Sequence, residues 1–321
     1  MHTDLPLDQL RTYRPEVAEP EDFDDFWTST LEQARAAGGE ATNVPAETPV
    51  AALRVEDVTF PGFDGEPVRA WFVAPPSEGP LPCVVEYLGY GGGRGLPQER
   101  LAWAAAGYAH LVMDTRGQGS TWGSGGDTPD PHGSGPAYPG VMTRGIESPH
   151  GYYYRRLVTD AVRAVDHVLT RADVDPARVA VAGTSQGGGL ALAAGALHEQ
   201  VAAVVADVPF LCHVERAVTI TDAAPYAEIT AYLAVHRGMR EQVFRTLSYV
   251  DGVVMARRIT APTMVSVALM DQTCPPSTVF AAANAIAEPP TVEVYPFNDH
   301  EGGAQEQWVR SARWLGEVLG R

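Results

Sequence analysis

The most informative short segment of the chain is the pentapeptide GTSQG at residues 183–187, a G-x-S-x-G pattern. In this pattern the serine sits on a sharp turn between a strand and a helix, and its flanking glycines leave room for that turn. The apolar run RVAVAG before Ser185 and the small-residue stretch GGLALAAGAL after it predict this setting. A glycine-rich turn without catalysis is the alternative interpretation. We predict that Ser185 is the nucleophile of an acyl transfer, because a serine hydroxyl attacks a carbonyl carbon once a base takes its proton.

The base should be a histidine that follows the serine, because the order serine, acid, histidine is typical of α/β-hydrolases. Four histidines follow Ser185 in the chain: His198, His213, His236 and His300. The first ends the helix that Ser185 begins, and the next two lie in residues 210–258. His300 follows the last apolar run, TVEVYP, and ligands of open α/β sheets bind at the carboxyl ends of strands. We therefore predict that His300 is the base, against the alternative of a histidine in a solvent-facing loop.

The acid of such a site holds the histidine in one tautomer and stabilises its charged form. Asp271 follows the apolar run TMVSVAL and lies between Ser185 and His300 in the chain. Asp207, which ends the run AAVVAD, is the main competitor, although it could instead be a buried aspartate bonded to loop amides. Asp299 adjoins His300, so its side chain cannot easily reach round to the imidazole. We predict Asp271 as the acid.

The negative oxygen of a tetrahedral intermediate needs N–H donors that are already in place. The first expected donor is the backbone N–H of Gln186, directly after the nucleophile. The second is the backbone N–H of Tyr90, in the glycine-rich loop 89–95, where glycine lets the backbone approach a ligand closely. A simple turn is the alternative for this loop, which lacks the G-x-G-x-x-G spacing of dinucleotide sites. His300-Glu301 lacks the second histidine of a zinc protease helix, so we expect neither metal nor cofactor.

Composition narrows the possible partners. The net charge of −17 disfavours nucleic acid and anionic membranes, and no apolar run is long enough to cross a bilayer. All 23 basic residues are arginine, which excludes a phosphate loop with its lysine as well as Schiff-base chemistry on a lysine amine. The N-terminal segment lacks the apolar stretch of a secretory signal. We expect a cytoplasmic protein whose three cysteines, Cys83, Cys212 and Cys274, are buried thiols.

The elements that would hold these residues alternate between strands and helices. Apolar runs predict a hairpin at 55–60 and 68–74, then strands at 83–88, 109–114, 178–183, 202–206, 263–269 and 291–296. Helical patterns cover 21–36, 152–170, 187–197, 275–287 and 304–319. This order predicts an α/β fold with a mostly parallel sheet covered by helices on both faces. We expect residues 1–50 to form a helical extension ending in a linker at 41–50, and residues 51–321 a catalytic domain. That domain would carry a long loop at 117–150 and a helical insertion at 210–258.

Longer stretches of the chain resemble the carbohydrate esterase family 7 enzymes, the acetyl xylan esterases or cephalosporin C deacetylases. The resemblance rests on Arg116-Gly117-Gln118, on GTSQG and on His300-Glu301. It continues through LPLDQLRTYRPE, MDTRGQGS, YPGVMTRGI with YYYRR, DVPFLCH, PYAEIT, FRTLSYVDG and DQTCPPSTVFAA. It implies an α/β-hydrolase fold, with Ser185, Asp271 and His300 as the triad and the amides of Tyr90 and Gln186 as oxyanion donors. For Arg116 and Gln118 we expect a structural role.

The same resemblance implies an enzyme that removes acetyl groups from small substrates, such as acetylated xylo-oligosaccharides and cephalosporin C. It also implies a cytoplasmic homo-oligomer, a hexamer with its active sites facing an internal cavity. A carboxylesterase, peptidase or acyltransferase with another acyl preference is the alternative on the same scaffold, since a fold does not determine a substrate. A hydrolase-like binding protein would ordinarily lack part of the triad, whereas every member is present here.

Overall fold

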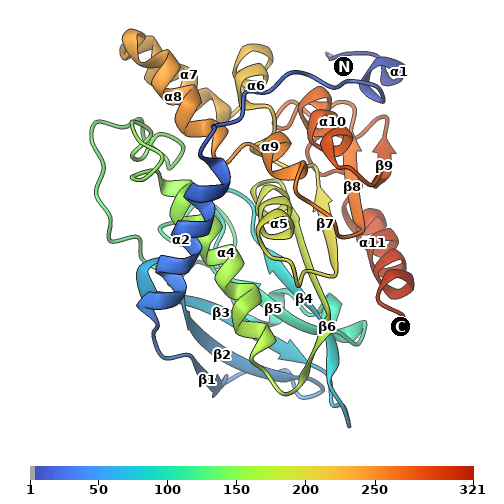
Figure 1. The fold of residues 1–321 in the computed structure, drawn as a ribbon. Helices are drawn as coiled ribbons and strands as arrows, with labels where there is room; N and C mark the ends of the chain where they lie inside the picture. The colour runs from blue at the N-terminus through green and yellow to red at the C-terminus, as the bar shows by residue number, and fades with distance from the viewer. Residues whose placement is uncertain (1–3) are drawn as a thin grey trace.

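A nine-stranded sheet runs through the computed structural model, which describes residues 4–321 (Figure 1). The strands are β1 (Thr42–Pro45), β2 (Arg54–Pro61), β3 (Pro67–Ala74), β4 (Leu81–Tyr87), β5 (Ala109–Met113), β6 (Val174–Thr184), β7 (Ala203–Asp207), β8 (Thr263–Ala268) and β9 (Thr291–Tyr295). Their order across the sheet is β1-β2-β3-β5-β4-β6-β7-β8-β9. The pairs from β1 to β5 are antiparallel, and every pair from β5 to β9 is parallel. The prediction of an antiparallel start and a mostly parallel sheet is confirmed.

Helices cover both faces of this sheet. They are α1 (Leu7–Leu10), α2 (Phe23–Ala37), α3 (Ala102–Ala105), α4 (Tyr153–Leu169), α5 (Gln186–Leu197), α6 (Val214–Ile220), α7 (Tyr226–Val235), α8 (Arg240–Ser248), α9 (Gly252–Ala256), α10 (Pro276–Ala285) and α11 (Ala304–Val318). Val85 of β4 packs in the larger core with α4, α5 and α10, whereas Val84 packs in a second core with Trp103 of α3 and Leu315 of α11. Neighbouring residues of a strand face opposite sides, so one strand contributes to both cores.

Two parts of the chain differ in how well the sequence predicted them. Residues 210–258 form α6 to α9, as expected for a helical insertion, and Figure 1 shows α7 and α8 at the end of the molecule away from β1. The prediction of a plain linker at 41–50 was wrong, because Thr42–Pro45 pairs with β2 as the antiparallel edge strand β1. This strand is exposed along its length and carries no apolar alternation, so only its partner identifies it.

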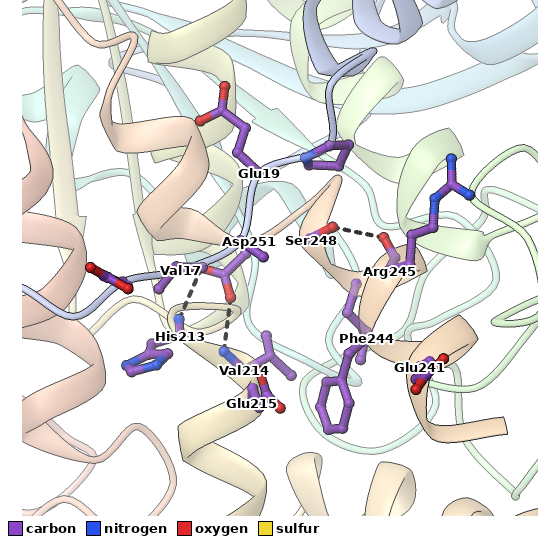
Figure 2. Close-up of a pocket in the computed structure, with 14 residues that line it drawn as sticks. Val17, Glu19, His213, Val214, Glu215, Glu241, Phe244, Arg245, Ser248 and Asp251 are labelled. Atoms are coloured by element: carbon purple, nitrogen blue, oxygen red, sulfur yellow. Dashed lines mark hydrogen bonds between the residues drawn. The ribbon is translucent and has the colours of Figure 1, made fainter. Parts of the chain in front are cut away.

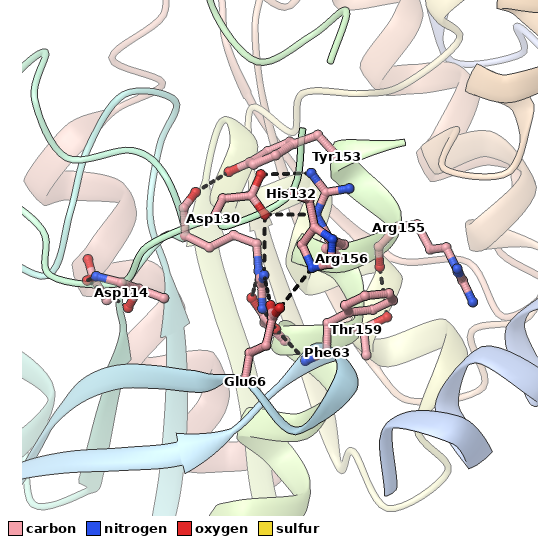
Figure 3. Close-up of polar contacts among 12 residues, drawn as sticks. Phe63, Glu66, Asp114, Asp130, His132, Tyr153, Arg155, Arg156 and Thr159 are labelled. Carbon is pink, nitrogen blue, oxygen red and sulfur yellow. Dashed lines mark hydrogen bonds and ion pairs between the residues drawn. The ribbon is translucent and has the colours of Figure 1, made fainter. Parts of the chain in front are cut away.

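A buried network of charged side chains joins the β2–β3 turn to α4 (Figure 3). The fully buried Arg116 makes two hydrogen bonds to Asp160, of 2.5 and 2.8 Å, and a third to Glu66. Beside it, Arg156 forms a bidentate pair with Asp130. Burial alone would lower the pKa of Arg116, but the charge of Asp160 and the hydrogen bonds to it raise that pKa well above its usual value.

We expect Arg116→Met to lower the free energy of unfolding by about 3–5 kcal/mol, because it leaves the buried carboxylate of Asp160 without its partner. Chemical denaturation monitored by circular dichroism measures this loss. The matched control is Arg310→Met, which removes a partly exposed arginine paired with Glu293 and Glu306 and should cost about 0.5 kcal/mol or less. Equal losses in the two variants would contradict a structural role for Arg116.

Candidate active site

Ser185 lies at the turn between β6 and α5, as the pentapeptide predicts. Its backbone has φ 59° and ψ −120°, a region that residues other than glycine rarely adopt. Two backbone hydrogen bonds hold this conformation: Ser185 N–H donates to the Asp207 carbonyl, and Phe210 N–H donates to the Ser185 carbonyl, each at 2.9 Å. Strain of this kind persists only where the surroundings impose it, and it is concentrated at functional sites.

The two glycines of the pentapeptide are required because neighbouring backbone atoms leave no room for a Cβ at either position. A Cβ on Gly183 would lie 2.3 Å from the carbonyl carbon of Gly187. A Cβ on Gly187 would lie 2.1 Å from the carbonyl oxygen of Tyr87 on β4. Both distances are far below van der Waals contact, so any larger residue would force the turn apart and move Ser185.

The structure brings the predicted nucleophile, base and acid into one chain of hydrogen bonds. His300 Nε2 lies 2.9 Å from Ser185 Oγ, and His300 Nδ1 lies 2.8 Å from Asp271 Oδ2. The other carboxylate oxygen of Asp271 accepts hydrogen bonds from the N–H groups of Thr273 and Cys274, both at 2.8 Å. The Asp271 side chain is fully buried, whereas that of His300 is 32% exposed. His300 can therefore exchange protons at a site whose acid is held fixed.

The loop with Tyr90 is tied to the nucleophile turn by one side chain, Gln118. Its Oε1 accepts a hydrogen bond of 2.5 Å from Gly91 N–H, and its Nε2 donates to Gln186 Oε1 at 3.0 Å. Trp122 Nε1–H donates to the Tyr90 carbonyl at 2.7 Å. Gln186 is the first residue of α5, where a backbone N–H has no partner four residues earlier in the helix. The segments with the two predicted donors are thus held together before any substrate arrives.

Glu228 of α7 connects the insertion to the same loop. The Tyr90 hydroxyl donates a hydrogen bond of 2.5 Å to Glu228 Oε1, and Met142 N–H donates to Glu228 Oε2 at 3.1 Å. Burial raises the pKa of this carboxyl group, although the hydrogen bond from Tyr90 acts in the opposite direction. Sequence reasoning did not identify Glu228, because its contact partners lie in two distant loops.

Asp207, the competing acid, contacts other groups than His300. It ends β7, its Oδ1 accepts a hydrogen bond of 2.9 Å from Gln307, and its carbonyl oxygen accepts the N–H of Ser185. Its place is thus beneath the nucleophile turn, whereas Asp271 is the carboxylate at the imidazole.

Asp207 should make the stability of the protein depend on pH. Burial raises the pKa of Asp207 from 3.8 to about 7, and hydrogen bonds with Ser266 and Gln307 only partly oppose this. Between these pH values the folded protein retains a proton that the unfolded chain releases, so stability is lost as pH rises.

We therefore expect Asp207→Asn, which cannot ionise, to gain stability relative to the wild type as the pH is raised from about 4 to about 8. Urea denaturation of both proteins across this range measures the difference. A difference in unfolding free energy that stays constant with pH would contradict the assignment.

A pocket of about 420 Å³ opens over Ser185 and His300. Its lining residues are Glu86, Tyr87, Leu88, Gly89, Tyr90, Arg100, Trp122, Thr184, Ser185, Ala224, Pro225, Thr273 and His300. The sequence predicted three of them, Tyr90, Ser185 and His300. It gave one hint of the rest: Glu86 is a charged residue inside the apolar run CVVEYL.

A second pocket, of about 310 Å³, lies between residues 16–20 and the insertion (Figure 2). Asp251 forms part of its wall and accepts hydrogen bonds from the N–H groups of His213 and Val214, as the dashed lines in Figure 2 show. The same carboxylate also caps α9 through Val253. None of the predicted site residues lines this pocket. The hydrogen bonds of Asp251 join segments within the insertion to one another.

Asp271, Cys274 and His300 each bring one possible metal ligand within 4.8 Å of the others. Both ring nitrogens of His300 already face Ser185 and Asp271, and burial raises the pKa of the Cys274 thiol well above its usual value. A protonated thiol is a poor metal ligand. Asp271 and His300 therefore fit a hydrogen-bonded triad with Ser185 better than a metal centre with Cys274.

Comparisons with known proteins match this chain to one family. The family model described as acetyl xylan esterase (AXE1) matches residues 1–318. An acetyl xylan esterase from Paenibacillus sp. R4 is 41% identical over 98% of this chain and 99% of its own, with a TM-score of 0.92. Acetyl xylan esterase 1 from Thermoanaerobacterium sp. JW/SL YS485 is 34% identical over the same shares, with a TM-score of 0.91.

A relative identified by its sequence is also an esterase of acetyl groups. The acetyl esterase Axe7A of Xylanibacter ruminicola is 27% identical over 94% of this chain and 68% of its own length. No helix within residues 4–321 is long and apolar enough to span a membrane. The match along nearly the whole chain, together with the sheet and its helices, shows that the chain belongs to the acetyl xylan esterase family, a family of carboxylic ester hydrolases with the α/β-hydrolase fold.

Proposed function

We propose that this chain removes acetyl groups from small substrates, with Ser185 as nucleophile, His300 as base and Asp271 as acid. The observation that carries the proposal is the hydrogen-bonded chain from Ser185 Oγ through His300 to the buried Asp271, in which Ser185 and His300 line a pocket. A serine hydroxyl becomes nucleophilic when a positioned imidazole takes its proton.

In the first half of the reaction, the Ser185 oxygen attacks the acetyl carbonyl carbon while its proton passes to His300 Nε2. The N–H groups of Tyr90 and Gln186 stabilise the negative oxygen of the tetrahedral intermediate. His300 then protonates the leaving alcohol, and the acetyl group stays on Ser185. In the second half, water gives a proton to His300 Nε2 and its oxygen attacks the acetyl carbon. His300 then returns that proton to Ser185 Oγ as acetate leaves, which restores the serine.

The pocket and the relatives support small acetylated substrates. A volume of about 420 Å³ suits a small molecule rather than a polymer chain. Two of the similar structures are named acetyl xylan esterases, so acetylated xylo-oligosaccharides are our first candidates. Cephalosporin C is a candidate substrate only because the sequence resembles the family described above.

We also propose, on that resemblance, a cytoplasmic homo-oligomer of six copies. The three free cysteines, all buried, are consistent with a reducing compartment. Sedimentation velocity of the purified protein tests the oligomer, and a monomer would contradict it.

The activity is tested by kcat/KM for 4-nitrophenyl esters from acetyl to octanoyl, alongside acetylated xylo-oligosaccharides and cephalosporin C. We expect the acetyl ester to be the best of the series and acetate to be released from the oligosaccharides. A fluorophosphonate probe should label Ser185, as peptide mass spectrometry would show. Equal activity on octanoyl or peptide substrates would instead favour an esterase or peptidase of other acyl preference.

A further inference from the structure

Three polar side chains that the mechanism does not use form a cluster in one wall of the active-site pocket. Glu86 of β4 accepts a hydrogen bond from Arg100 Nη1–H on one carboxylate oxygen. Its other carboxylate oxygen lies 2.8 Å from His110 Nε2 on β5. The second ring nitrogen of His110 lies 3.2 Å from the Arg100 carbonyl oxygen. Glu86 and Arg100 line the pocket that holds Ser185 and His300, and His110 is fully buried behind them.

The sheet register explains why this cluster borders the nucleophile. His110 pairs with Val84 in the neighbouring parallel strand, and residues 84 and 86 face the same side of the sheet. On the other flank of β4, Glu86 pairs with Ala182 of β6, two residues before Thr184 on the same face. Thr184 lines the pocket and immediately precedes Ser185.

The hydrogen bonds leave one group of the cluster open to the pocket. Both oxygens of Glu86 are engaged, and both nitrogens of His110 face acceptors. Burial would raise the pKa of Glu86, but the hydrogen bond from His110 and the charge of Arg100 outweigh it and lower that pKa, so the carboxylate is ionised. The Arg100 side chain is 31% exposed, and only one of its three nitrogens donates to the cluster.

We propose that Arg100, held in place by Glu86 and His110, is a subsite for a carboxylate carried by the alcohol part of the acetyl ester. This inference rests on the proposed function, because it takes Ser185 as the point of attack. The acetyl group occupies the space beside Ser185 and the oxyanion donors, and the carboxylate of the alcohol part lies against the guanidinium.

A carboxylate fits this wall better than a neutral hydroxyl group. The open atoms of Arg100 are donors only, and a planar guanidinium matches a carboxylate with two parallel hydrogen bonds. Both oxygens of Glu86 are already engaged in hydrogen bonds, so the guanidinium of Arg100 is the charged group of the cluster with donors left for a ligand. Arg100 is the arginine, and Glu86 the carboxylate, among the residues that line this pocket.

The kinetic test uses a matched pair of substrates, 4-acetoxybenzoate and 4-acetoxybenzamide, with the 3-acetoxy isomers to vary the position of the charge. For each protein the measured quantity is the kcat/KM ratio of acid to amide, which cancels effects common to both esters. We expect Arg100→Met to lower this ratio roughly tenfold, and Arg100→Lys to lower it less because the charge remains. The control Arg310→Met, on α11 and outside the lining of the pocket, should leave the ratio unchanged.

A binding measurement separates this inference from the proposed function. In the Ser185→Ala background, calorimetry gives the Kd of the intact acid and amide with no hydrolysis. We expect the acid to bind more tightly by roughly tenfold, and Arg100→Met in the same background to remove that preference.

Each outcome bears on one claim alone. Equal binding of acid and amide by the Ser185→Ala protein, or equal effects of Arg100→Met on both esters, overturns the carboxylate subsite. Hydrolysis that survives Ser185→Ala overturns the proposed function and leaves the binding preference as a separate result. Thermal unfolding of the Arg100 variants shows whether they are folded, and Arg100→Lys gives a second comparison if the methionine variant is not.

Discussion

Ser185→Ala should lower kcat/KM for 4-nitrophenyl acetate on the order of 10⁵-fold. The variant loses the oxygen that is placed to attack the carbonyl with its proton directed at His300, since Ser185 Oγ lies 2.9 Å from Nε2. What remains is the positioning of substrate and water by the pocket and the oxyanion donors. Initial rates of nitrophenol release at matched protein concentration measure the effect.

The fold should survive this substitution. The methyl group of alanine fits where the serine side chain stood, and the backbone hydrogen bonds of the turn at Asp207 and Phe210 are unaffected. Ser29→Ala is the control, because this exposed serine of α2 bonds only within its own helix. A Ser185→Ala protein that kept more than a hundredth of the activity would refute an acyl-enzyme at this residue.

Asp271→Asn should lower kcat for the same ester by about 10⁴-fold. Asparagine can still accept the N–H groups of Thr273 and Cys274 on one atom, so the loop keeps its shape. Its amide NH₂ then faces His300 Nδ1 and makes that nitrogen an acceptor. The proton must move to Nε2, where it blocks removal of the proton from Ser185.

The comparison with Asp207→Asn makes this prediction specific. Asp207 was the rival acid in the sequence, but it contacts Gln307 and lies beneath the nucleophile turn. We expect its asparagine variant to lose far less activity than Asp271→Asn under the same assay. Losses of the same size in both variants would mean that the carboxylates act through the fold rather than through the imidazole.

The sequence predicted most strands and helices because each pattern that identifies them involves residues close together in the chain. Buried parallel strands need apolar runs, and these stand out at β4 to β8. The edge strand β9 is only half-buried, and its sequence TVEVY alternates. The turn at Ser185 could be predicted for the same reason, since the space at Gly183 and Gly187 is set by the turn itself. His300 and Asp271 could be predicted from chain order, because the carboxyl ends of parallel strands meet at one edge of the sheet.

Other parts could not be predicted because they depend on contacts between distant segments. The short strand β1 has no pattern of its own and exists through its pairing with β2. The cluster of Glu86, Arg100 and His110 requires the register of β4 against β5, which sequence spacing does not determine. The same holds for Trp122, whose indole reaches the Tyr90 carbonyl from the long loop.

The contact between Tyr90 and Glu228 bears on how the enzyme could be re-engineered. The insertion supplies the carboxylate that anchors the side chain of an expected oxyanion residue, so it is not an interchangeable cover over a complete catalytic centre. A chimera that received the corresponding helices of another esterase would inherit a new substrate wall and a disturbed reaction centre together. Changes of substrate specificity are therefore better made at the pocket wall that carries Glu86 and Arg100 than by exchanging the insertion.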